Sequence, residues 1–61
     1  MCESTVYLKT KDEMKKIMEN VVIITPEQNG VFIEDILGEQ QTIEGKITQI
    51  KLLDHMILIE A

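Results

Sequence analysis

The 61-residue chain contains no arginine, no tryptophan and only one cysteine, and its only aromatic side chains are Tyr7 and Phe32. Eleven acidic residues against six lysines give it a formal charge of −5. Because affinity for nucleic acids depends largely on basic side chains and on aromatic platforms for the bases, this composition argues against a nucleic-acid partner. A single cysteine excludes an internal disulfide. We therefore expect oligomerisation or a bound metal to supply the extra stability that so short a chain needs.

The chain also lacks the segments that direct a protein to or across a membrane. Its start, Met1 to Ser4, has no basic region followed by an apolar stretch, which a signal peptide requires. No apolar run approaches the roughly 18 residues of a transmembrane helix. We therefore expect a cytoplasmic protein with no membrane contact, in which a lone thiol stays reduced.

Aliphatic side chains are abundant, and hydrophobic residues make up 44% of the sequence. Short runs of them alternate with turn residues at intervals of roughly ten positions, which is typical of a small β barrel or sandwich. Pro26 is expected to end one strand, Asn29-Gly30 is the strongest hairpin signal, and Gly45 predicts a kink or bulge. The expected strands are residues 4–10, 21–25, 31–37, 40–46, 47–53 and 56–60.

Residues 13–22 are compatible with either a helix or a strand. Asp12 is able to cap the start of a helix, and five apolar residues fall at helical spacing: Met14, Ile17, Met18, Val21 and Val22. The surrounding pattern favours β structure. The residues alone do not decide between the two.

Signatures of an enzyme are absent from the sequence. The three glycines are scattered, so there is no glycine-rich phosphate loop. A cysteine nucleophile needs a base within hydrogen-bond reach, and His55 is the only histidine. We expect His55 to be a polar residue of the turn near Asp54, and it becomes a metal ligand only if the fold brings it to Cys2. We therefore predict that the protein is not an enzyme.

Cys2 is the residue with the most distinctive position, because it follows Met1 directly. A lone cysteine is commonly a small buried hydrophobe, but chain ends are usually poorly packed. If Met1 is removed, the thiol and the α-amine of Cys2 can chelate a divalent metal. Thiolate and nitrogen donors in a square-planar arrangement indicate Ni(II) or Cu(II). One thiol cannot complete such a site, so a second chain has to supply the remaining ligands.

Four segments together resemble the CooT family of small nickel-binding proteins: residues 1–8, 18–21, 37–39 and 44–47. The most specific element is the cysteine immediately after Met1, followed by Val6-Tyr7-Leu8. The resemblance spans essentially the whole chain. It implies a single domain over residues 1–61, an all-β Sm-like or SH3-like barrel of five to seven strands, and an extended conformation for residues 13–18. It also implies a cytoplasmic homodimer that binds Ni(II) through Cys2, with a link to nickel delivery for carbon monoxide dehydrogenase.

Three functions remain open at this point. The first is a nickel metallochaperone in which two Cys2 residues share one Ni(II) at a homodimer interface, because a two-fold axis places the same residue twice. The alternative is an Sm-like module that binds RNA or protein and has no metal role, although the charge disfavours RNA. The third is a structural subunit or adaptor whose exposed strand edge pairs with a partner. The strand of residues 56–60 is able to supply that edge or to close a barrel.

Overall fold

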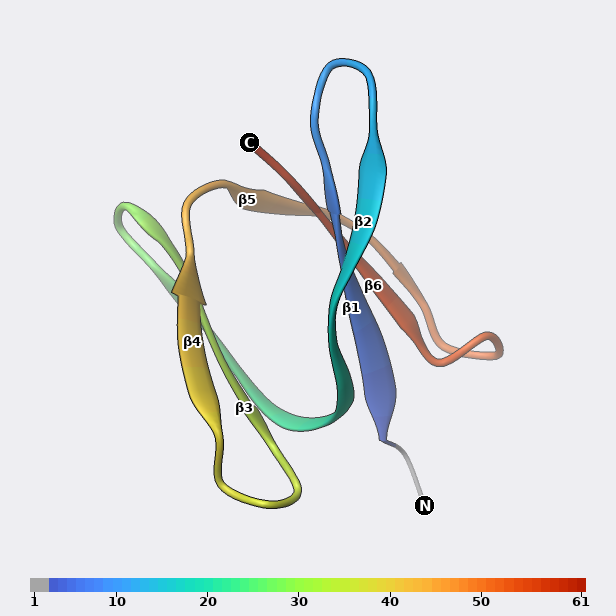
Figure 1. The fold of residues 1–61 in the computed structure, drawn as a ribbon, viewed down its shortest axis with the longest axis vertical. Helices are drawn as coiled ribbons and strands as arrows, with labels where there is room; N and C mark the ends of the chain where they lie inside the picture. The colour runs from blue at the N-terminus through green and yellow to red at the C-terminus, as the bar shows by residue number, and fades with distance from the viewer. Residues whose placement is uncertain (1–2) are drawn as a thin grey trace.

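A computed structural model describes residues 3–61, which form one curled β-sheet (Figure 1). The sheet order is β4-β3-β2-β1-β6-β5, so β4 and β5 are its two outer strands. The predicted all-β fold class is confirmed, and the sheet curls without closing between β4 and β5. Within residues 3–61, no helix is long and apolar enough to cross a membrane. The strands are β1 (Ser4–Lys9), β2 (Met14–Glu27), β3 (Gly30–Asp35), β4 (Gln40–Ile43), β5 (Lys46–Lys51) and β6 (Met56–Glu60).

The ambiguous segment is extended and belongs to β2, the longest strand. Its helical spacing has a structural cause. Met18 pairs with Val6 and Val21 pairs with Ser4, so the register shifts between these two pairs. Such a bulge adds a residue to one strand, which lets Met18 and Val21 share the buried face although they are three positions apart. The bulge therefore gives this strand a three-residue spacing between buried residues, which in a sequence is typical of a helix.

The prediction that Pro26 ends a strand is wrong. Pro26 lies inside β2 and pairs with Val31 of β3. The pairing of β2 with β1 stops at Val21, so the last part of β2 has a hydrogen-bonded neighbour on one side only. Proline lacks an N–H group and is tolerated in a strand where that group has no partner strand to meet.

The core is aliphatic and lies on the concave side of the curled sheet. The parallel pairing of β1 with β6 brings Val6 opposite Ile57 and Leu8 opposite Ile59. Strand β6 therefore lies between β1 and β5, and the suggestion that residues 56–60 form an exposed edge is wrong. Ile57 and Ile59 of β6 are buried because side chains of the strands on both sides, β1 and β5, cover them. The buried hydrophobic residues are Val6, Met18, Val21, Val31, Ile33, Ile57 and Ile59.

The predicted hairpin is present, but its glycine has a different role from the expected one. Gln28 and Asn29 form the turn, and Gly30 is the first residue of β3, paired with Glu27. A Cβ atom at Gly30 would lie 2.6 Å from the carbonyl oxygen of Ile43. Gly30 therefore permits the close approach of the strand that follows β3, instead of supplying a turn conformation.

Strand β3 ends at Asp35, two residues before the expected end, because the side chain of Asp35 organises the next turn. One carboxylate oxygen accepts hydrogen bonds from the backbone N–H groups of Leu37 and Glu39, each at 2.9 Å. An aspartate that bonds to backbone groups ahead of it in this way competes with the regular strand ladder. The carboxylate thereby sets the geometry of the β3–β4 connection.

We expect Asp35→Ala to lower the free energy of unfolding by about 1 kcal/mol, because two backbone donors lose their protein acceptor while remaining accessible to water. Asp35→Asn keeps an acceptor oxygen in the same place and should lose less. Chemical denaturation of the three proteins measures the difference. Equal stability of the alanine and wild-type proteins would show that this carboxylate does not anchor the turn.

Candidate functional site

The candidate site lies where β1 begins and β6 begins, at one end of the sheet. These strands run parallel, and Thr5 is the partner of Met56. The N–H group of Thr5 donates a hydrogen bond of 2.8 Å to the carbonyl oxygen of His55. The N-terminal end of β1 and the turn between β5 and β6 therefore meet at this end of the molecule (Figure 1).

The β5–β6 turn comprises residues 52–55, and the sequence predicted a turn at Asp54-His55. The N–H group of His55 donates to the carbonyl oxygen of Leu52 at 3.3 Å, which closes the turn. His55 has a φ of 52°, in the left-handed region. Histidine is one of the few side chains other than glycine that are enriched in this region. The turn therefore ends on an exposed histidine immediately before β6.

Cys2, the ligand predicted from the sequence, lies outside the described residues. Its role as a ligand therefore stays a prediction from the sequence.

Sequence reasoning placed His55 in a turn but had no means of relating it to Cys2. The two residues lie near opposite ends of the chain, and the parallel β1–β6 pairing brings the turn that contains His55 to the start of β1. No local pattern reports which distant strands become neighbours. His55 is the residue of this site whose position the structure supplies.

A nickel site needs several ligand side chains that lie close together. Within residues 3–61, no group of three or more His, Cys, Asp or Glu side chains is arranged to hold a metal. A closed site formed by these residues alone is therefore not available. Thiolates and imidazoles are donor types that suit Ni(II), and His55 is the imidazole among the described residues.

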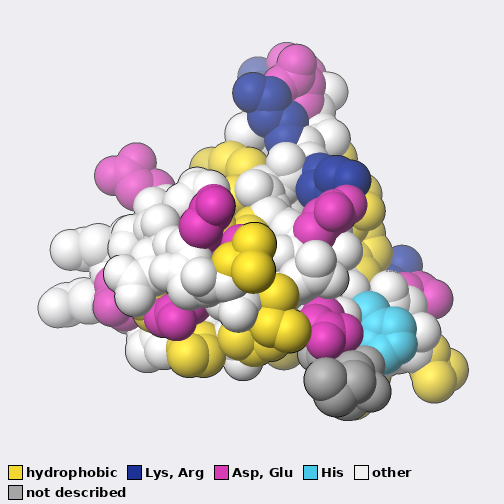
Figure 2. Space-filling view, turned by 60° about the horizontal axis from the view of Figure 1, so that its bottom comes forward, with side chains coloured by type: hydrophobic (Ala, Val, Ile, Leu, Met, Phe, Trp, Pro, Cys, Tyr) yellow, Lys and Arg dark blue, Asp and Glu magenta, His cyan; other side chains and the backbone are white. Residues whose placement is uncertain are grey.

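The surface around this end is partly apolar. Leu52 and Leu53 precede Asp54 and His55 in the turn, and their side chains are 80% and 97% exposed. Figure 2 shows the single histidine on this face, where hydrophobic and acidic side chains are also exposed. Covering these two exposed leucines with a partner would remove apolar surface from water, which is favourable.

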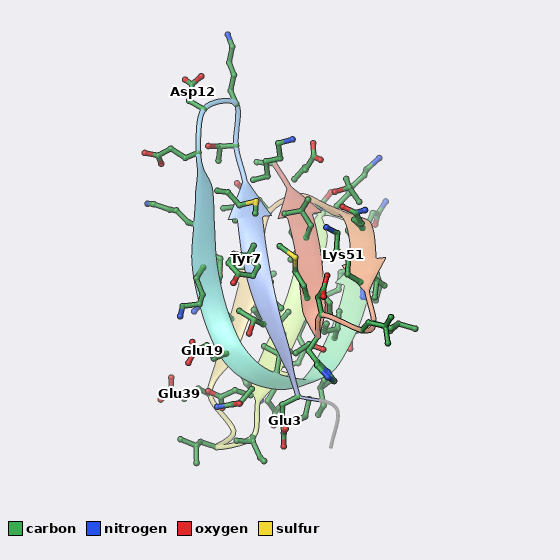
Figure 3. The ribbon with its side chains drawn as sticks, turned by 90° about the vertical axis from the view of Figure 1, so that its right-hand side faces the viewer. Glu3, Tyr7, Asp12, Glu19, Glu39 and Lys51 are labelled. Atoms are coloured by element: carbon green, nitrogen blue, oxygen red, sulfur yellow. The ribbon has the colours of Figure 1, made fainter. Side chains whose placement is uncertain are left out.

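A second candidate is an open depression of about 440 Å³ between β2 and the β3–β4 connection. Lys16 and Glu19 of its wall form a hydrogen-bonded ion pair, which raises the pKa of Lys16 and lowers the pKa of Glu19. Both groups are exposed, so the pair stabilises the fold little. Figure 3 shows Glu19 and Glu39 at this side of the sheet and Glu3 at the start of β1. The lining contains no thiol and no imidazole, so it does not suit nickel.

Comparison with known proteins gives a match to one family. The profile of the family described as CO dehydrogenase accessory protein CooT matches residues 1–60, a range that contains both Cys2 and His55. An uncharacterized protein of Methanothermobacter thermautotrophicus is 40% identical over 60 residues, which are 98% of this chain and 89% of that protein. An uncharacterized protein of Archaeoglobus fulgidus is 37% identical over 43 residues, which are 70% of this chain and 96% of that protein.

A solved structure has the same fold. A crystal structure from Carboxydothermus hydrogenoformans, provisionally named CooT, superposes with a TM-score of 0.87 at 32% sequence identity. The match covers 97% of this chain and 95% of the other. The curled sheet is therefore shared over essentially its full length.

Proposed function

The chain belongs to the CooT family of CO dehydrogenase accessory proteins, and on that premise we propose that it binds Ni(II) through Cys2 at the interface of a homodimer. The metal would then be delivered in the cytoplasm to a nickel enzyme such as carbon monoxide dehydrogenase. The observation that carries this proposal is the family match over residues 1–60, because that range includes the only thiol of the chain.

The proposed site uses two copies of one short segment. Each Cys2 would contribute a thiolate and a main-chain or terminal nitrogen to one shared Ni(II), which would give two sulfur and two nitrogen donors. Such a set in a plane suits a d⁸ ion. An isologous interface supplies it without any further ligand type, because the two-fold axis repeats Cys2. A metal held by chain ends is also transferred with less rearrangement than one in a closed cage.

Features of the described residues support a dimer that involves this end of the sheet. A chain of 61 residues buries only roughly 60% of its unfolded surface, so it gains stability from association. Leu52 and Leu53 are exposed beside the β1 end, and the outer strand β5 has one neighbour only. The two leucines and the unpaired edge of β5 lie close together, and a second copy of the chain would cover both.

Mass measurement under native conditions tests the proposal. With Ni(II) added, we expect a species that contains two chains and one nickel ion, because one thiol per chain cannot complete the site. The measurement is made with and without nickel, and the same spectra report whether Met1 is present. A single chain that binds one nickel ion with unchanged affinity on dilution would contradict the shared site.

The position of the interface is tested by a matched pair of variants. Leu53→Glu places a charge in the β5–β6 turn and should favour single chains. Leu37→Glu makes the same change at an 83% exposed leucine of the β3–β4 turn, at the other edge of the sheet, and should leave the dimer intact. Dissociation by Leu37→Glu alone would place the interface elsewhere.

A further inference from the structure

We propose that the outer edge of β4 is a docking site for an extended, basic segment of another protein, which pairs with β4 as an additional strand. The proposal goes beyond the nickel site, because it concerns described residues alone and needs no metal. Strand β4 is an outer strand of the sheet, and within residues 3–61 its hydrogen-bonded neighbour is β3 alone. The other side of β4 therefore presents backbone groups on which a second chain can pair.

The hydrogen-bond pattern identifies the backbone groups that face outward. The N–H group of Asp35 donates to the carbonyl oxygen of Glu39 at 2.9 Å, so these two residues form a hydrogen-bonded pair at the start of the β3–β4 ladder. In an antiparallel ladder such pairs alternate with pairs whose N–H and carbonyl groups point away from each other. The register from there to Ile43 is regular, so the outward groups belong to Gln40 and Thr42.

Strand β4 has few of the features that keep an edge strand from pairing with another chain. Natural edges are commonly blocked by lysines, by prolines or by bulges. The sequence of β4 is Gln40-Gln41-Thr42-Ile43, which contains no charged residue and no proline, and its pairing with β3 has no register shift. Its first three residues are exposed. The edge is therefore open to the addition of a strand.

The charge around β4 indicates a basic partner. Glu39 precedes the strand, Glu44 follows it, and both are exposed. From residue 28 to residue 45 the chain contains four acidic residues and no basic one. A symmetric pair of two β4 strands would set the glutamates of one copy against those of the other, which is unfavourable. An extended segment with lysine or arginine residues five positions apart instead places a positive charge opposite each glutamate.

The connection that leads into β4 adds apolar surface. Ile36 and Leu37 are 53% and 83% exposed. Their backbone is held in place, because the N–H group of Ile36 donates to the carbonyl oxygen of Asn20 and that of Leu37 donates to the carboxylate of Asp35, each at 2.9 Å. A docked segment that carries apolar residues between its basic ones removes part of this surface from water. The expected ligand is therefore both basic and β-forming.

The test uses metal-free, full-length protein and the synthetic peptide Lys-Val-Thr-Val-Thr-Lys, whose lysines are spaced like the two glutamates. An NMR titration of the ¹⁵N-labelled protein locates the contact and gives the affinity. We expect the amide signals of residues 40–43 to shift. The affinity should be at least about fivefold higher than for the same peptide with glutamate in place of both lysines, and it should fall as salt is added.

Two proline variants test the pairing itself. Thr42→Pro removes an outward N–H group that β3 does not use, as the chain already tolerates at Pro26 of β2. We expect this variant to remain folded and to bind the lysine peptide at least about tenfold more weakly, since it loses a backbone hydrogen bond and its ring blocks the edge. Gln41→Pro removes an N–H group that faces β3, so it should destabilise the fold instead.

A charge variant tests the recognition of the partner whether or not Thr42→Pro folds. The double variant Glu39→Gln with Glu44→Gln should bind the lysine peptide about fivefold more weakly, because two exposed ion pairs are lost. Glu13→Gln is the matched control, since Glu13 is an exposed glutamate in the β1–β2 connection, and its affinity should equal that of the wild type.

Four results would overturn the inference. They are no binding of the lysine peptide, equal binding of the two peptides, wild-type binding by the charge variant, and wild-type binding by folded Thr42→Pro. Sedimentation of Thr42→Pro supplies a further check, because a smaller assembly than that of the wild type would show that this edge joins copies of the chain. None of these measurements involves nickel, so the proposed function is judged separately by its own experiments.

Discussion

Cys2→Ser should bind Ni(II) more than about 100-fold more weakly than the wild-type protein, because loss of a direct ligand exceeds the effect of losing an outer partner. Serine has almost the same shape, but its hydroxyl group stays protonated near neutral pH and is a harder donor than a thiolate. The substitution therefore removes the sulfur chemistry with little change in volume. In the proposed dimer one substitution removes two ligands, since the axis repeats the position. Calorimetric titration measures the affinity.

The control for this experiment is Ser4→Ala, which changes a small polar residue two positions after Cys2 in the sequence. Ser4 begins β1, and its replacement should leave nickel affinity unchanged. Unfolding of the metal-free proteins is recorded in parallel to show that all of them fold. Equal nickel affinity of Cys2→Ser and the wild type would end the proposal that the thiol is a ligand.

Gly45→Ala should destabilise the fold by about 3 kcal/mol or more, through a strained backbone together with a steric overlap. Gly45 has a φ of 140°, a conformation that side chains other than glycine rarely adopt. A Cβ atom there would lie 2.5 Å from the carbonyl oxygen of Glu60. A domain of this length has a total stability of roughly 3–5 kcal/mol, so the variant should be largely unfolded. Circular dichroism and thermal unfolding report the loss.

Gly38→Ala is the matched control, because it separates the two causes. Gly38 also has a positive φ, of 90°, but no atom lies within 4 Å of the position that its Cβ would take. We expect it to lose about 1 kcal/mol through backbone strain alone and to remain folded. Equal destabilisation by the two variants would show that the contact with Glu60 contributes nothing.

Local features of the fold could be read from the sequence with good accuracy. The strand predicted at residues 4–10 is observed at Ser4–Lys9. The turn predicted at Asp54-His55 is the second half of a turn that covers residues 52–55, so the strand expected at 47–53 ends earlier, at Lys51. The extended conformation of Met14 to Met18 needed the family resemblance, because bulges disturb the alternation on which strand prediction depends. Pro26 led to a wrong prediction because proline has no backbone N–H group to donate to a neighbouring strand. This lack destabilises a strand only where a neighbouring strand would accept that hydrogen bond, and the sequence does not show where this is so.

The candidate site was predicted only in part. The sequence identified Cys2 from its position beside Met1 and from the family resemblance, and that residue lies outside the described part of the chain. It gave a second copy of Cys2 as the partner of the thiol and left the position of His55 open. The structure places His55 beside the start of β1, through the parallel pairing of Thr5 with Met56. It also showed two exposed leucines next to that end.

By itself, the order of residues determined an aliphatic all-β domain, most of its turns and the place of its single thiol in the sequence. These are properties of composition and of neighbours along the chain, where side-chain alternation and backbone preference act directly. Only the tertiary structure decided that β6 lies inside the sheet against β1 and that the histidine therefore stands beside the first strand. That arrangement arises because Ile57 and Ile59 are buried only when strands flank them on both sides, a requirement of the whole core that no short stretch of sequence contains.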